Sequence, residues 1–348
     1  MHAQLLSALQ RIADVRLVAS LKDNRIGYPG VNDLRVFVPD VHLISAARQQ
    51  QGGFQYATNY TELLTEVFLT LAQLRRQTAP GANVSVYCIG DLLDLWREAP
   101  GFAAGDDAAA RIRDSHEDLI VAAFSRDLHT RFLLGNHDFN LYHWPAYTAW
   151  ERRFYLPDAT VQQPRVILVH GDIFDWIESF PTEIKQILVY LFSPNAAPNT
   201  YALGQMEALT RRAHDGRNYR QFIQAPQPLR LGTLRRPGAD PVPPRWNVQT
   251  PGASPPETLK FLDAAAAETA ACKTKYDLDL RLMVIGHTHF ARIAVKEDAG
   301  SFFALLDCGA WIEQCAWDED GQTVVAPNAQ LGALCDNEVR LYQLAPRT

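Results

Sequence analysis

Five short motifs in this sequence carry side chains of the kinds that bind metal ions. They are Asp40-Val41-His42, Gly90-Asp91-Leu92-Leu93-Asp94, Gly135-Asn136-His137-Asp138, His170-Gly171-Asp172 and Gly286-His287-Thr288-His289. Two carboxylates, four imidazoles and one amide are the candidate ligands: Asp40, Asp91, His42, His170, His287, His289 and Asn136. Such a set suits two divalent cations that activate water for attack on a phosphorus centre.

Asp91 is the expected bridge between the two cations, because a carboxylate has two oxygens. Only Asp40 and Asp91 are anionic in the ligand set, so two divalent cations would leave a net charge of about +2. A positive well of this kind can hold a phosphate anion, even though the whole chain has a net charge of −6.

Most of these motifs directly follow an apolar run that predicts a buried strand. The runs are 34–38, 84–89, 132–134, 166–169 and 282–285. Open α/β sheets place their ligands at the carboxyl ends of strands, so we expect the motifs to meet at one edge.

Helical periodicity separates several of these strands. It predicts helices over 59–76, 108–128 and 257–273, and a short amphipathic helix at the start of the chain, where Leu5, Leu6, Leu9, Ile12 and Val15 recur. The strand–helix–strand order predicts parallel pairing through a right-handed crossover. Short strands without helical periodicity follow at 293–295, 302–306, 323–325 and 339–344, which favours a second sheet packed on the first.

The chain of 348 residues is expected to form one large α/β domain, 1–348, with an insertion. Prolines crowd the middle of the segment between His170 and His287, and proline at that density excludes regular helix and central strand. We therefore expect a cap insertion over 178–256.

Arginine is concentrated in this insertion. Residues 207–245 hold eight arginines and no lysine, against three acidic residues. Arginine forks match phosphate oxygens, so one hypothesis is that the insertion grips a second anionic part of a substrate. The candidate substrate contacts are Arg211, Arg212, Arg235, Arg236 and, beside the third motif, His143. The alternative is that the arginines form a solvated loop.

Composition narrows the class of protein. The net charge of −6 argues against nucleic-acid binding by the whole surface. Five widely spaced cysteines without a C-x-x-C pattern are typical of reduced thiols, and 1–20 lack the apolar core of a signal peptide. No apolar run is long enough for a transmembrane helix, so we expect a cytoplasmic protein, for which peripheral membrane contact stays open.

The five motifs, in this order, resemble those of the calcineurin-like metallophosphoesterase superfamily. The resemblance extends over about 35–315, and it implies that family's fold, a β-sandwich flanked by helices in four αββα layers. It also implies that Asp40, His42, Asp91 and His289 bind one metal ion, while Asp91, Asn136, His170 and His287 bind the other. Manganese is the metal that the family favours; nitrogen and oxygen ligands also admit Fe, Zn, Co or Ni.

By the same resemblance, a hydroxide between the two metals attacks phosphorus in line, and His137 protonates the leaving oxygen. Imidazole suits this role because it titrates near neutral pH. Asp94 and Asp138 are candidates to orient His137 or the ligand histidines. Either carboxylate could instead cap a turn or a helix.

Departures within the motifs narrow the subfamily. Protein Ser/Thr phosphatases carry arginine and glutamate where this chain has Leu95 and Asp138, so a protein phosphatase of that type is not expected. Three stretches resemble a bacterial branch related to UDP-diacylglucosamine pyrophosphatases. They are 90–96, 170–175 and 308–313. Pro39 and Ala310 depart from that branch's pattern.

Three functional hypotheses follow. The first is a metal-dependent phosphoric ester hydrolase, a phosphatase or phosphodiesterase, acting on a phosphorylated small molecule or a nucleotide-like substrate. The second is a pyrophosphatase that cleaves a phosphoanhydride of a nucleotide-sugar lipid. The third is a scaffold without catalysis that retains the fold. The scaffold is disfavoured because the chain keeps every ligand and the catalytic histidine.

Overall fold

The computed structural model describes residues 1–50, 60–95, 98, 108–138, 141, 153–157, 164–174, 229–230, 246–249, 256–298, 301–317 and 323–347. The helices are α1 (His2–Leu9), α2 (Ala46–Gln50), α3 (Thr61–Gln77), α4 (Ala108–Ser115), α5 (Glu117–Ala123) and α9 (Pro256–Tyr276), with short 3-10 turns η1 (Asn24–Ile26) and η4 (Asp172–Phe174). The strands up to the proline-rich segment are β1 (Ala13–Lys22), β2 (Asp33–Val38), β3 (Asn83–Cys88), β4 (Arg131–Phe132), β5 (Arg153–Pro157) and β6 (Pro164–Val169). Those after it are β7 (Leu229–Arg230), β8 (Trp246–Gln249), β9 (Leu282–Ile285), β10 (Arg292–Asp298), β11 (Ser301–Asp307), β12 (Trp311–Trp317), β13 (Thr323–Cys335) and β14 (Glu338–Pro346).

The strands form two mixed sheets. Within the described residues, the first sheet has eight strands along the path β1-β14-β13-β2-β3-β4, with β12 and β7 extending from β13. The second has six, in the order β5-β6-β9-β11-β10-β8. Three neighbours in each sheet are parallel: β2, β3 and β4 in the first, and β6, β9 and β11 in the second. Within each sheet, the carboxyl ends of these three strands lie at the same edge, so the loops that follow them lie side by side.

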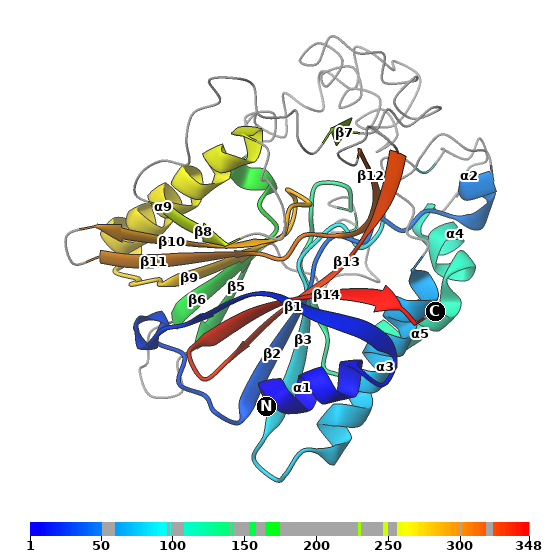
Figure 1. Ribbon diagram of the computed structural model, residues 1–348, viewed down its shortest axis with the longest axis horizontal. Helices are drawn as coiled ribbons and strands as arrows, with labels where there is room; N and C mark the ends of the chain where they lie inside the picture. Colours follow the sequence, from blue (N-terminus) through cyan, green and yellow to red (C-terminus); the bar gives the residue numbers. More distant parts are fainter. Residues whose placement is uncertain are drawn as a thin grey trace.

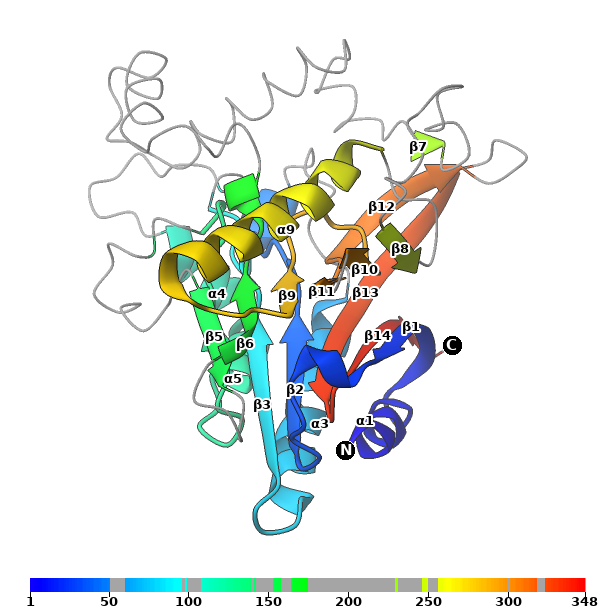
Figure 2. The same cartoon turned by 90° about the vertical axis from the view of Figure 1, so that its left-hand side faces the viewer.

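Three hydrophobic clusters show how the layers stack. The first joins one face of the first sheet, for example Val36 and Val86, to the buried sides of α1, α3, α4 and α5. The second lies between the two sheets and includes Phe37 from the first and Val284 from the second. The third joins the other face of the second sheet to α9 through Leu262. The fold is thus mixed α/β, with helices packed against both sheets, as Figures 1 and 2 show.

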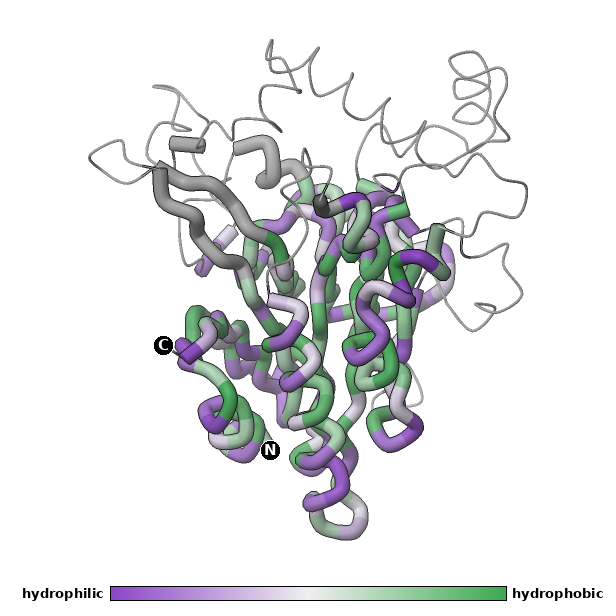
Figure 3. Tube along the Cα trace, turned by 90° about the vertical axis from the view of Figure 1, so that its right-hand side faces the viewer, coloured by the Kyte–Doolittle hydropathy of each residue, from purple (hydrophilic) through white to green (hydrophobic). Residues whose placement is uncertain are grey.

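The burial pattern of α3 explains its place in these layers. Leu64, Val67, Phe68 and Leu71 recur every three or four residues and are fully buried, so one face of the helix covers the first sheet. Each such side chain contributes about 1.5–3 kcal/mol on burial. Hydrophobic and hydrophilic residues alternate along the helices on this side of the molecule (Figure 3).

Several predicted elements are confirmed. The runs 34–38, 84–89, 166–169 and 282–285 form β2, β3, β6 and β9, and the helices predicted over 59–76 and 257–273 are α3 and α9. The predicted parallel crossover is present, because β2 pairs parallel with β3 across α3.

Other predictions are wrong in detail. The opening helix stops at Leu9, and Val15 belongs to β1, which pairs with β14. The helix predicted over 108–128 is two helices that meet at His116 and end at Ala123. The late strands do not form a sheet of their own. β10 and β11 join the second sheet, whereas β13 and β14 join the first.

The long segment between the fourth and fifth motifs is described only at a few points. Inside the predicted insertion, β8 pairs with β10 at the edge of the second sheet, and β7 pairs with β12. No helix among the described residues is long and apolar enough to cross a membrane. Cys88, Cys272, Cys308 and Cys335 are buried free thiols, in line with the predicted reduced cysteines.

Candidate metal centre

Loops from both sheets bring the five motifs together. Asp40, Asp91 and Asn136 follow the parallel strands β2, β3 and β4 of the first sheet, whereas His170 and His287 follow β6 and β9 of the second. The first two loops are joined by hydrogen bonds, because the amides of Val41 and His42 both donate to the Asp91 carbonyl, at 3.0 and 2.8 Å. The last two are joined by the Gly286 amide, which donates to the His170 carbonyl at 2.9 Å.

Four of the predicted ligands have a left-handed backbone. The φ angles of His42, Asp91, His287 and His289 are 55°, 46°, 65° and 60°. This region costs a residue with a side chain on the order of 1–2 kcal/mol, so the surrounding structure must hold each residue there. Strained backbone of this kind clusters at functional sites.

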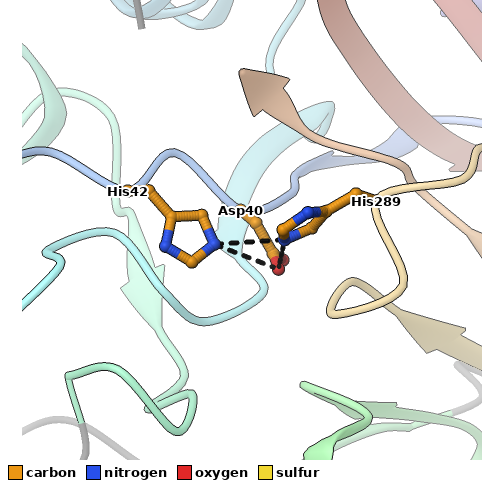
Figure 4. A group of neighbouring side chains, drawn as sticks. All are labelled: Asp40, His42 and His289. Carbon is orange, nitrogen blue, oxygen red and sulfur yellow. Dashed lines mark hydrogen bonds and ion pairs between the residues drawn. The ribbon is translucent and has the colours of Figure 1, made fainter. Parts of the chain in front are cut away.

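Asp40, His42 and His289 form the first group that could hold a metal ion (Figure 4). His289 Nε2 lies 3.1 Å from Asp40 Oδ2 and 3.1 Å from His42 Nε2, and His42 Nε2 lies 3.9 Å from the same carboxylate oxygen. Asp40 is fully buried. Two imidazole nitrogens and a carboxylate therefore converge on one small volume.

Asp91, His170 and His287 form the second such group. His170 Nε2 lies 3.1 Å from Asp91 Oδ2 and 3.1 Å from Asn136 Oδ1, so the predicted amide ligand belongs to it too. His170 Nδ1 donates to the Ile89 carbonyl at 2.9 Å, which fixes the tautomer and turns Nε2 toward Asp91. The rings of His170 and His287 lie with centroids 5.0 Å apart.

Asp91 lies between the two groups. Its Oδ2 is 3.7 Å from His42 Nε2 of the first group, and its Oδ1 accepts a hydrogen bond from the His137 amide at 2.8 Å. His42, Asp91 and His137 form a third set of potential ligands, and in each of the three sets the ligand atoms lie within 4.8 Å of one another. Asp91 thus belongs to two of the three sets and adjoins the third.

Asp94 contacts two imidazoles at once. Its Oδ1 accepts from His137 Nδ1 at 2.8 Å, and its Oδ2 accepts from His42 Nδ1 at 2.9 Å. Asp94 is fully buried, so these hydrogen bonds are shielded from water. The orienting contact predicted for Asp94 is therefore present in the structure.

Asp138 has a different set of partners. Its Oδ1 accepts from the Gly135 amide at 2.7 Å, and its Oδ2 accepts from the Leu92 amide at 3.0 Å. Burial, together with the charge of Asp91, raises the pKa of Asp138 to about 7. These contacts match the turn-capping alternative for Asp138, and they tie the third motif to the second.

Burial and neighbouring charges shift the pKa values of several residues of the site. Burial raises the pKa of Asp91, but the imidazoles of His170, His137 and His42 outweigh it and hold the pKa well below its usual range. Burial lowers the pKa of His170, but Asp91 and Asp40 outweigh it and raise that pKa well above its usual range. Burial lowers the pKa of His289 to about 4, so its imidazole is neutral at pH 7 and able to ligate.

Two glycines of the motifs have a structural role that the sequence analysis missed. A Cβ atom at Gly135 would collide with Asp91 Oδ1, and one at Gly286 would collide with Asp40 Oδ1. Each carboxylate thus packs directly on a backbone that lacks a side chain. The glycines were visible in the motifs, but sequence spacing could not show which atom approaches them.

The sequence analysis also missed further residues behind the site, because their side chains are not among the candidate ligands. Glu98 is buried and accepts from the amide and hydroxyl of Ser45 at 2.9 and 2.7 Å, which fastens the first motif loop to the second. Thr288, inside the fifth motif, contacts the buried Asp307. The predicted substrate contacts Arg211, Arg212, Arg235, Arg236 and His143 lie outside the described residues.

No protein-family model matches the chain, and no curated protein is significantly similar to it. The interpretation of the site therefore depends on its own residues and geometry.

Proposed function

We propose that the chain is a dinuclear-metal-dependent phosphoesterase of the calcineurin-like metallophosphoesterase type, with that family's four-layer arrangement. One observation carries the proposal: ligand atoms from five separate loops converge in two groups that adjoin at Asp91. Buried charges are costly unless they are paired or coordinate a metal.

Asp40, His42, Asp91 and His289 would hold one divalent cation, and Asp91, Asn136, His170 and His287 would hold the other. Two cations bound there would lower the pKa of a water molecule and offset the charge of the phosphoryl oxygens. The ligand atoms are nitrogen and oxygen without thiolate, a set that admits Mn, Fe, Zn, Co or Ni. Among these metals, manganese is the one that the family resemblance favours.

His137 supplies the proton in this proposal. Its Nδ1 is hydrogen-bonded to Asp94 at 2.8 Å, so Nε2 is the nitrogen that would give a proton to the leaving oxygen. The Asp94 carboxylate holds the ring in that tautomer. His137 is 4% exposed, which limits exchange of this proton with bulk water.

The test is hydrolysis of p-nitrophenyl phosphate and bis(p-nitrophenyl) phosphate by metal-stripped protein resupplied with Mn²⁺. We expect turnover that depends on Mn²⁺ and falls about 10²–10⁴-fold in His137→Asn, the range typical of a general acid. The exposed His129 provides a matched control, because His129→Asn changes the same side chain away from the site.

Equal turnover in His137→Asn and His129→Asn would contradict the role of His137. Absence of turnover with both esters, alongside cleavage of a nucleoside diphosphate sugar, would replace the ester with a phosphoanhydride substrate. Binding of Mn²⁺ without turnover of any of these compounds would overturn the proposed hydrolase in favour of a scaffold.

A further inference from the structure

The fifth motif loop has a buried carboxylate behind it that belongs to neither metal group. β11 pairs parallel with β9, and this register places Asp307 beside Ile285, immediately before Gly286. Asp307 is fully buried at the carboxyl end of β11. The sheet itself therefore delivers this carboxylate to the base of the loop that carries His287 and His289.

Thr288 is the point of contact. Its hydroxyl donates to Asp307 Oδ2 at 2.5 Å, and its Oγ1 accepts from the Phe290 amide at 3.2 Å. Thr288 itself is 8% exposed. The residue between the two histidines is thus fixed through its side chain, not only through its backbone.

Arg292 holds the carboxylate in place. It pairs with Asp307 across β10 and β11, and its guanidinium donates to Asp307 Oδ2 at 3.1 Å. Both side chains are fully buried. A buried pair of this kind has little rotational freedom, so Asp307 offers Thr288 an acceptor at a fixed position.

The other side of the same loop is fixed by a ligand. The His287 amide donates to both oxygens of Asp40, at 3.0 and 2.9 Å. The loop is therefore held between Asp40 on the side of the metal site and Asp307 on the side of the sheet. Two left-handed histidines flank Thr288, and such a backbone persists only where the surroundings determine it.

We propose that Asp307, acting through Thr288, is a positioning residue for His287 and His289 and thereby sets the metal affinity of both groups. One histidine belongs to each group, so a single anchor between them controls two sites. The inference rests on the proposed metal centre but not on the reaction. Residues that orient metal ligands typically change metal affinity 10–100-fold when they are lost.

A titration of the protein with Mn²⁺, without substrate, tests the inference. Electron paramagnetic resonance measures the concentration of free Mn²⁺. Thr288→Val keeps the shape of the side chain and removes its hydroxyl. We expect it to weaken the binding of Mn²⁺ to both groups about 10–100-fold. Thr288→Ser retains the hydroxyl and should restore wild-type affinity.

Thr269→Val is the matched control. Thr269 is also 8% exposed, but its hydroxyl donates to the Ala265 carbonyl within α9. The same chemical change there should leave Mn²⁺ affinity as in wild type. Thr288→Ala and Thr269→Ala repeat the comparison without a new methyl group, and they serve if Thr288→Val does not fold.

The inference would be overturned if folded Thr288→Val bound Mn²⁺ with an affinity within twofold of the Thr269→Val value. It would also be overturned if only one of the two groups lost affinity for Mn²⁺. The outcome is separate from that of the proposed function. A wild-type protein that binds Mn²⁺ but hydrolyses nothing would refute the phosphoesterase and leave the anchor intact. Full turnover and full affinity in Thr288→Val would refute the anchor alone.

Discussion

At the scale of single residues, one carboxylate controls the orientation of two imidazoles. Asp94 accepts a hydrogen bond from His42, a proposed metal ligand, and from His137, the proposed acid. Because both acceptor oxygens are occupied and the side chain is fully buried, neither ring can rotate without breaking a shielded hydrogen bond.

Asp94→Asn should therefore impair the site without changing its shape. An amide has one oxygen and cannot accept from both rings, so one of them loses its partner. We expect turnover or Mn²⁺ affinity to fall about 10–100-fold. Steady-state kinetics and Mn²⁺ titration would measure this, with the exposed Asp114→Asn as control.

A double mutant shows whether Asp94 acts through His137. Residues that act as a unit are not additive, so Asp94→Asn should reduce turnover much less in a His137→Asn background than in wild type. Full additivity of the two losses would contradict the coupling that the 2.8 Å hydrogen bond suggests.

At the scale of elements, the strand ends fix the carboxylates against glycines. Gly286→Ala would force the new methyl group into the carboxylate of Asp40. Asp40 belongs to the first group of potential ligands, together with His42 and His289. We expect a loss of Mn²⁺ affinity on the order of 10–100-fold, with little change in the fold. Gly30→Ala, just before β2, places its methyl group 3.1 Å from Asp33 and should leave Mn²⁺ binding as it is. Unchanged Mn²⁺ titration curves in Gly286→Ala would contradict the close packing.

A second element-scale prediction concerns the ends of β6 and β9 away from the site. Asp279 accepts hydrogen bonds from Arg165 and Arg281 there. Burial raises the pKa of Asp279, but these arginines outweigh it and lower the pKa below its usual value of 3.8. A lowered pKa means that Asp279 stabilises the folded state above pH 3.8, and that this contribution is lost as pH falls further.

Thermal unfolding of wild type and Asp279→Asn across pH 2–7 would measure this contribution. We expect the melting temperature of Asp279→Asn to lie below that of wild type at neutral pH, and the difference to shrink as the pH falls below about 4. A difference that grows toward low pH would have the wrong sign for a lowered pKa.

At the scale of the whole molecule, potential metal ligands from the two sheets meet at the site. Asp40 and Asp91 come from the first sheet, and His170, His287 and His289 come from the second. Cations bound between them would link the two layers, so metal binding should stabilise the entire fold and not only its loops.

Metal removal tests this expectation. Bound metal stabilises the folded state by about 2.7 kcal/mol when its concentration is 100 times the dissociation constant. We expect the melting temperature to rise with added Mn²⁺ and to fall after chelation. Asp91→Asn should lose most of the rise, because Asp91 adjoins both groups, whereas Asp114→Asn should keep it. An equal Mn²⁺ shift in both variants would contradict a site at Asp91.

Local sequence determined those helices and strands whose hydrophobic pattern can be recognised without knowledge of distant partners. The runs before the motifs became β2, β3, β6 and β9, because a short, continuous apolar run that is bounded by turn residues is typical of a strand buried on both faces. Residue types also determined the candidate ligands, since Asp40, Asp91, Asn136 and the four histidines could be chosen for their chemistry alone. That the motifs meet followed from one rule about the carboxyl ends of parallel strands.

Tertiary structure decided what depends on partners distant in sequence. Val15 fits the period of a helix, but β14 at the other end of the chain pairs with that stretch and makes it a strand. The late strands divide between both sheets because β13 pairs with β2 near the start of the chain, whereas β11 pairs with β9 of the second sheet and with β10. The same reason hid the roles of Thr288, Asp307 and Gly286: their importance lies in which atom approaches them, and only folding brings those atoms together.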